Sequence, residues 1–165
     1  MPAEAALVEG APAPNFNVVA DDGRMVSLED FRGRHLILYF YPKANTTGCT
    51  HEAIGFRDRM MDFQALKTSI VGVSGDSIED QTKFKQRYSL NFPLLADTEY
   101  QVIEAYDARR MKSFFGKSFL GIVRMTFWIG PDGVIRKVWP RVSVNGHADE
   151  ALNAIRETEM KAATA

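Results

Sequence analysis

Runs of apolar residues in the chain predict strands where they are continuous and bounded by turn residues. The run His35–Tyr41 is apolar after its first residue and rich in β-formers, which is typical of a strand buried on both faces. Ser69–Ser74 and Phe92–Ala96 predict two further strands. Two pairs of shorter runs flank turn residues and predict hairpins, namely Phe16–Val19 with Met25–Leu28 and Ile122–Ile129 with Val134–Trp139.

Apolar positions at three- and four-residue spacing predict helices. Phe56, Met60, Phe63 and Leu66 follow this spacing and predict one helix that begins at Cys49 or Thr50 and ends near Lys67. The other expected helices are Ile78–Leu90, a short helix from Asp97 or Thr98 to Tyr106, and His147–Lys161. The segment Asp107–Leu120 is basic and aromatic, has no clear period, and receives no element.

The order of these elements predicts the fold class. Strands alternate with helices, an N-terminal hairpin precedes them, and a second hairpin comes before the last helix. This order favours a mixed central sheet flanked by helices, an α/β thioredoxin-like fold with an N-terminal β-hairpin extension. No repeat or linker divides the 165 residues, so we expect a single domain spanning 1–165. A fold alone leaves the function open.

Charge and composition narrow the classes of function. The 20 basic and 21 acidic residues leave a net charge of -1, so we expect neither nucleic acid nor a membrane surface as a partner. No run approaches the roughly 18 apolar residues of a membrane span. The first residues lack the basic and apolar regions of a signal peptide, and one cysteine cannot form an intrachain disulfide. We therefore expect a cytoplasmic protein.

The only cysteine, Cys49, lies where the loop after the buried strand meets the next predicted helix. A helix N-terminus offers free backbone N–H groups and a positive dipole end, which favour the thiolate. A thiolate is the nucleophilic form of cysteine. The alternative is that Cys49 is a small, inert apolar residue at the edge of a loop.

The residues around Cys49 carry a motif. Pro42, Thr46 and Cys49 form the pattern PxxxTxxC within FYPKANTTGCTHEA. This resembles the active-site motif of the peroxiredoxins and is most similar to the Q-type branch, the bacterioferritin comigratory proteins. The resemblance continues through GVSGDS, FPLLAD, GIVRMTFWIGPDG and VWPRVSVNGHADE, and so covers nearly the whole chain.

The resemblance implies a thiol-specific peroxidase for hydrogen peroxide and organic hydroperoxides, an antioxidant enzyme without metal, haem or flavin. It implies that Cys49 attacks the peroxide and becomes a sulfenic acid. Thr46 would then position peroxide and sulfur, and Pro42 would exclude water from the loop. Their alternatives are an ordinary turn threonine and a strand terminator.

Two charged residues complete the implied site. The family places the arginine that matches Arg124 against the sulfur, where it favours the thiolate and stabilises charge on the oxygens. The alternative is an edge strand from which Arg124 points to solvent. Glu52 matches the glutamate of the TxE motif, with proton handling and capping of the helix's first turn as equal alternatives. His35 and His147 have no ligand-like companions, so we expect no metal site.

The chain departs from many Q-type members because it has no second, resolving cysteine. Ile54 and Lys85 stand at the two places where such a cysteine occurs in that branch. A chain that naturally has one cysteine and a chain altered at these positions both fit this pattern. In either case an external thiol, such as a thioredoxin, glutaredoxin or small thiol, must reduce the sulfenic acid. We expect a monomer, with a dimer as the alternative.

Two other functions remain to be weighed. The first is a non-catalytic thioredoxin-fold binding module in which Cys49 is incidental. The second is a cysteine hydrolase, which needs a histidine held by Asn or Asp. His51 does not suit that role, because residues two positions apart on a helix do not face each other.

Overall fold

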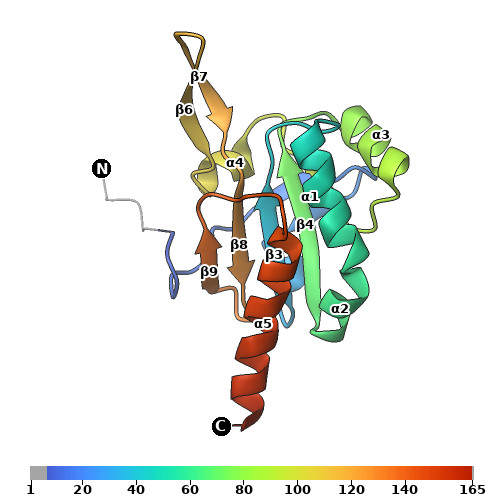
Figure 1. The fold of residues 1–165 in the computed structure, drawn as a ribbon, viewed down its shortest axis with the longest axis vertical. Coiled ribbons are helices and arrows are strands. Elements are labelled where there is room, and N and C mark those ends of the chain that lie inside the picture. Colours follow the sequence, from blue (N-terminus) through green and yellow to red (C-terminus); the bar gives the residue numbers. More distant parts are fainter. Residues whose placement is uncertain (1–6, 165) are drawn as a thin grey trace.

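A computed structural model describes residues 7–164. Its centre is a five-stranded mixed sheet in the order β5-β4-β3-β8-β9 (Figure 1). β3 is parallel to β4, and β4 is parallel to β5, whereas β8 is antiparallel to β3 and β9. These strands are β3 (His35–Phe40), β4 (Thr68–Ser74), β5 (Leu94–Ala96), β8 (Met125–Ile129) and β9 (Ile135–Trp139). The predicted thioredoxin-like α/β fold is confirmed.

Alternate residues of β3 face two separate apolar cores. Leu36, Leu38 and Phe40 point into one core, while Ile37 and Tyr39 point into the other. All six residues of β3 are buried, because the strand is central in the sheet and both of its faces are covered. This explains why its sequence is continuously apolar after His35.

Four helices cover the face that carries Ile37 and Tyr39. Phe56, Phe63, Phe84 and Ile155 are fully buried there, and each comes from a different helix. The helices are α1 (Thr47–Asp58), α2 (Met60–Ala65), α3 (Ile78–Tyr88) and α5 (His147–Thr164). Figure 1 shows α1 and α5 lying side by side over this face of the sheet.

The N-terminal elements and one short helix cover the opposite face. They are the antiparallel pair β1 (Asn17–Val19) and β2 (Met25–Ser27), the 3₁₀ turn η1 (Leu28–Phe31), and α4 (Gln101–Ala105). The N-terminal hairpin predicted for this region is confirmed. The short helix predicted from Asp97 or Thr98 begins later, with Tyr100 as its N-cap, but the Asp97 carboxylate accepts hydrogen bonds from the backbone N–H groups of Gln101 and Ile103, each at 2.8 Å.

The segment Asp107–Leu120, for which the sequence predicted neither a helix nor a strand, lies largely in an antiparallel hairpin. The hairpin consists of β6 (Arg109–Phe114) and β7 (Lys117–Ile122) and projects from the body of the molecule (Figure 1). The prediction of one continuous strand over Ile122–Ile129 was wrong. β7 ends at Ile122, and β8 begins at Met125. The intervening backbone leaves the sheet, because the N–H of Val123 donates to the Ala108 carbonyl and the Arg124 carbonyl accepts from Val142.

The predicted helix from Cys49 to Lys67 was also wrong in two respects. It begins earlier, at Thr47, and it is broken at Arg59, whose φ of -103° and ψ of 9° end α1 and start α2. The apolar spacing hid this break because Phe56, Met60 and Phe63 are buried in the same core on either side of it. The side chain of Arg59 is held to α5 by Asp149, with Nε and Oδ1 2.6 Å apart.

Within residues 7–164, no helix is long and apolar enough to cross a membrane.

Candidate active site

Cys49 lies in the first turn of α1, with only 1% of its surface exposed. Thr46 is the N-cap and has extended backbone angles, and the N–H of Thr50 donates to its carbonyl at 2.8 Å. The amides before Thr50 are therefore the free N–H groups of a helix start. Although the helix begins before Cys49, the thiol remains beside the positive end of the dipole.

Arg124 reaches Cys49 from the backbone break between β7 and β8. Its Nη2 lies 3.4 Å from Sγ of Cys49, and its Nη1 lies 2.8 Å from Oε1 of Glu52. The Arg124 side chain is 19% exposed, so the alternative that it points to solvent from an edge strand was wrong. Burial acts to lower the pKa of Arg124, but Glu52 and Cys49 raise it overall, so the guanidinium stays charged.

Glu52 is buried in the second turn of α1 and forms the ion pair with Arg124. Burial raises the pKa of Glu52 to about 7, although Arg124 opposes this shift. Its Oε2 has no hydrogen-bond partner among the described residues. The capping alternative for Glu52 was wrong, because the side chain turns inward to Arg124 and lies beyond the first turn.

Gly48 leaves room for the guanidinium. A Cβ atom at this position would lie 3.2 Å from Nη2 of Arg124, which is closer than ordinary van der Waals contact. The absence of a side chain therefore lets Arg124 pass close to the first turn of α1. Only the folded arrangement reveals this requirement, because Arg124 is distant from Gly48 in the sequence.

A polar network supports the loop before α1 and was missed by sequence reasoning. Asp76 Oδ2 accepts from the Ala44 N–H at 2.8 Å and from the Ser74 hydroxyl at 2.6 Å. Gln81 Nε2 donates to the same hydroxyl at 2.8 Å, and its Oε1 accepts from the hydroxyl of Tyr41. The loop is thus tied to the end of β4 and to α3. The GVSGDS sequence, which contains Ser74 and Asp76, was a usable signal.

Thr46 and Pro42 lie in the loop that leads to Cys49. The Thr46 hydroxyl donates to the Lys43 carbonyl at 2.8 Å, which shapes the loop. Thr46 is exposed, and Pro42 is half-buried. The roles that the resemblance implies for Thr46 and Pro42 stay predictions.

The histidine nearest in sequence, His51, is exposed, and no hydrogen bond joins it to Cys49 within the described chain. The buried His147, at the start of α5, bridges Thr126 Oγ1 at 2.8 Å and Glu150 Oε1 at 3.0 Å. Burial lowers the pKa of His147, which favours the neutral ring. His147 therefore joins α5 to β8, and both of its ring nitrogens are bonded to groups other than Cys49, so no Cys–His couple within residues 7–164 supports hydrolysis.

Tyr39 is a further buried polar residue close to this site. It packs against Phe56 with ring centroids 4.7 Å apart, and its hydroxyl has no partner among residues 7–164. Burial raises the pKa of Tyr39 well above its ordinary value, and the acidic groups Tyr41, Glu52 and Cys49 raise it further, so it is a neutral phenol. Tyr39 therefore adds bulk rather than charge to the wall behind α1.

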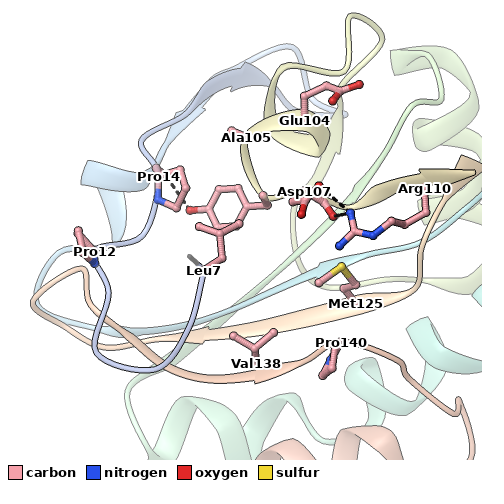
Figure 2. A pocket seen from close by; sticks show the side chains of 11 residues that line it. Leu7, Pro12, Pro14, Glu104, Ala105, Asp107, Arg110, Met125, Val138 and Pro140 are labelled. Carbon is pink, nitrogen blue, oxygen red and sulfur yellow. Dashed lines mark hydrogen bonds and ion pairs between the residues drawn. The ribbon is translucent and has the colours of Figure 1, made fainter. Parts of the chain in front are cut away.

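A cavity of about 610 Å³ lies elsewhere, between the N-terminal segment, α4 and the base of β6 (Figure 2). Its wall includes Met125, which belongs to the core on the opposite side of the sheet from Cys49. This cavity is therefore separate from the groups that surround Cys49. Cys49 does not line this cavity.

The comparisons decide the family. Residues 10–138 match the model of the AhpC/TSA family. The chain belongs to the AhpC/TSA family. It is 44% identical over 146 residues to a putative peroxiredoxin Bcp of Coxiella burnetii, covering 88% of this chain and 97% of that protein. It is 43% identical over 152 residues to peroxiredoxin Bcp of Bacillus subtilis, covering 92% and 97%.

A solved structure supports the same assignment. It comes from a study of alkyl peroxide reduction by the bacterioferritin comigratory protein of Xanthomonas campestris. That chain has a TM-score of 0.83 and 34% sequence identity, and the match covers 87% of this chain and 91% of that one. This AhpC/TSA member is therefore a peroxiredoxin, a thiol-dependent peroxidase, as the resemblance predicted. The non-catalytic binding module is not supported.

The two positions that lack a resolving cysteine are both occupied by packed or paired side chains in this peroxiredoxin. Ile54 lines a small cavity between α1 and the start of α5. Lys85, on α3, pairs with the buried carboxylate of Asp21, with Nζ and Oδ2 2.9 Å apart. The chain has a single cysteine, so neither position can supply an internal disulfide.

Proposed function

We propose that Cys49 reduces hydrogen peroxide and alkyl hydroperoxides. The observation that carries this proposal is the 3.4 Å contact between Arg124 Nη2 and Sγ of the buried Cys49. The guanidinium of Arg124 and the N-terminus of α1 both place positive charge beside the sulfur. The relative from Xanthomonas campestris, studied for alkyl peroxide reduction, supports the organic substrates.

The proposed step forms one bond and breaks another. The Cys49 thiolate attacks one peroxide oxygen, an S–O bond forms, and the O–O bond breaks. The departing oxygen takes a proton from solvent and leaves as water or as an alcohol, while the sulfur becomes a sulfenic acid. Arg124 stabilises the negative charge that builds on the departing oxygen. Glu52 is a positioning residue, because its carboxylate holds the second nitrogen of the guanidinium.

Recycling requires an external thiol. Two reductant thiols supply two electrons, the sulfenic oxygen leaves as water, and the products are the Cys49 thiol and an oxidised reductant. A thioredoxin, a glutaredoxin or a small thiol can fill this role. Because Cys49 is only 1% exposed, a protein reductant can reach it only after the residues around it move apart. A lone thiol suits the reducing cytoplasm, in which we place the protein as a monomer.

The test is the intact mass after a brief exposure to a limiting amount of peroxide, with and without a sulfenic-acid trap. We expect addition of one oxygen, converted completely to the trapped adduct, and no change in a Cys49→Ser variant. Peroxide consumption by wild type without any adduct at Cys49 would reject the proposal.

A further inference from the structure

The β6–β7 hairpin exposes apolar side chains on both of its faces and at its tip. It stands clear of the body of the molecule (Figure 1), and Phe115 at the turn is 90% exposed. The other exposed apolar residues of the hairpin are Met111, Phe114, Phe119 and Leu120. A cluster of this kind marks a contact surface, because single exposed apolar residues are common but contiguous ones are not. A two-stranded ribbon is also marginally stable alone.

The outer half of the hairpin is cationic. Residues 109–122 contain four basic and no acidic side chains. At the base, Arg109 pairs with Glu104 at 2.8 Å and Arg110 pairs with Asp107 at 2.6 Å, the second pair being visible in Figure 2. Lys112 and Lys117 lie further along the strands, and neither forms an ion pair with any carboxylate of residues 7–164, although the Lys112 ammonium donates to the Ile122 carbonyl. Neither cation is therefore neutralised by a carboxylate of the described chain.

The strand register interleaves these lysines with aromatic rings. Lys112 lies opposite Phe119, and Phe114 lies opposite Lys117. Because alternate residues of a strand share a face, these four side chains lie on one face of the hairpin. The other face carries Met111 opposite Leu120. Rings that enter a headgroup layer beside lysines that meet phosphates are typical of proteins that bind membrane surfaces.

We propose that the outer half of the β6–β7 hairpin, residues 112–119, docks on an anionic lipid bilayer. A second copy of the chain is a poorer partner, because pairing of identical hairpins brings Lys112 and Lys117 against like charges. An acidic protein surface would cover one face and leave the other apolar face and Phe115 in water. A lipid headgroup layer surrounds an inserted tip on every side.

Insertion is shallow. Each strand of the hairpin has one edge without a neighbouring strand, so its N–H and C=O groups need water. The tip therefore enters the hydrated headgroup layer and stops there. No membrane-spanning helix is needed for this contact. The net charge of -1, from which we expected no membrane partner, averages over the cationic tip and the more acidic remainder of the chain.

The experiment is co-sedimentation of the full chain with vesicles of phosphatidylglycerol and phosphatidylcholine in equal amounts, or of phosphatidylcholine alone, at low ionic strength. We expect binding only to the anionic vesicles and release by salt. A Lys112→Gln/Lys117→Gln variant should bind at least about 20-fold more weakly, since each basic residue near the surface contributes about fivefold. A Phe114→Ser/Phe115→Ser variant should lose detectable binding.

Matched controls separate the hairpin from general surface effects. Met61→Ser removes an apolar side chain that is 85% exposed on α2, and Lys67→Gln/Lys83→Gln removes two cations elsewhere. Both should bind as wild type does. A Phe115→Trp variant should show blue-shifted emission with anionic vesicles and quenching by brominated lipid, because both native tryptophans are buried.

Three results would overturn the proposal. These are no binding of wild type to anionic vesicles at low salt, equal weakening by the control variants, and unchanged binding of the Phe114→Ser/Phe115→Ser variant. A dimer that this same variant dissociates, without any vesicle binding, would assign the surface to a second copy instead. Peroxidase activity and thermal unfolding should be unchanged in all hairpin variants, which excludes misfolding as the cause.

Discussion

Arg124 and Cys49, 75 positions apart in the sequence, place Nη2 and Sγ 3.4 Å from each other. The two residues come from different layers of the fold. Cys49 lies on a helix over the sheet, and Arg124 lies in the backbone break that leads into β8. The contact therefore forms only when α1 is packed on the sheet, which makes the activated thiol a property of the folded protein.

Replacement of Cys49 by serine should abolish thiol-dependent peroxide consumption. Serine has nearly the same shape but is not nucleophilic at neutral pH, so the circular dichroism spectrum should remain that of wild type. Peroxide consumption with dithiothreitol as the reductant provides the measurement. Retention of turnover in this variant would rule out Cys49 as the reacting group.

Replacement of Arg124 by leucine should slow peroxide attack by about 100- to 1,000-fold, the usual loss when a donor to a developing oxyanion is removed. The alkylation rate of Cys49 near neutral pH should fall as well, because the thiolate loses its neighbouring charge. Stopped-flow measurements across a pH series check both effects. The exposed Arg136, replaced by leucine, provides the control, and equal behaviour of the two variants would place Arg124 outside the reaction.

Replacement of Gly48 by alanine should slow peroxide attack by up to about tenfold, because the new Cβ would lie 3.2 Å from Nη2 of Arg124 and displace it. The matched control is Gly55→Ala on the same helix, where the new Cβ would lie 3.5 Å from Cβ of Ala148, an ordinary contact. Both substitutions replace a glycine of α1 by alanine, the residue with the highest helix propensity. Slower attack in Gly48→Ala than in Gly55→Ala would show that the attack rate depends on the position of Arg124. Equal rates would contradict the claim that Gly48 makes room for its guanidinium.

The buried Glu52 should make stability depend on pH. Its pKa of about 7 exceeds the ordinary 4.5, so the folded state retains a proton that the unfolded chain releases. The stabilisation from this proton is complete below pH 4.5 and is lost as the pH rises to about 7. Relative to Glu52→Gln, wild type should therefore lose up to about 3 kcal/mol over this range.

Urea unfolding at a series of pH values measures this difference. Glu157→Gln, which removes an exposed carboxylate from α5, is the control and should track wild type. A constant difference between wild type and Glu52→Gln from pH 4.5 to pH 7 would show that Glu52 titrates normally in the folded protein.

Excess peroxide should oxidise Cys49 beyond the sulfenic acid. With Ile54 and Lys85 at the two familiar resolving positions, the oxidised sulfur has no thiol partner in its own chain. Mass spectrometry should show one added oxygen with limiting peroxide and two or three with excess peroxide, and the latter should resist ordinary thiols. A non-reducing gel should remain mostly monomeric. Quantitative, reducible dimers would instead assign resolution to a second copy of the chain.

The sequence predicted secondary structure best where a strand is buried on both faces. His35–Tyr41 is apolar on both faces of a central strand, so the pattern predicted β3 closely. The β6–β7 hairpin was missed because both of its faces are exposed, and no apolar alternation distinguishes one from the other. The break at Arg59 was missed because the core-facing residues keep their spacing across it.

The residues of the site and the contact of Arg124 with Cys49 were predictable, but the packing around them was not. The motif identified Cys49, and the resemblance identified Arg124 and Glu52 as its companions. The inward turn of Glu52, the space left by Gly48 and the support from Asp76 depend on tertiary packing. No local pattern encodes these contacts, since each joins segments that are distant in the sequence.

The origin of Arg124 in a strand break, rather than on α1, separates two stages of the proposed cycle. An opening of the first turn of α1 that exposed Cys49 to a reductant would move its sulfur, while the Arg124 backbone is bonded to Val142 at the edge of the sheet. The oxidised sulfur would then leave the cation beside which it reacted. Peroxide attack would then take place beside the guanidinium and recycling away from it. A substitution near Arg124 could therefore change the rate of attack without changing the rate of recycling.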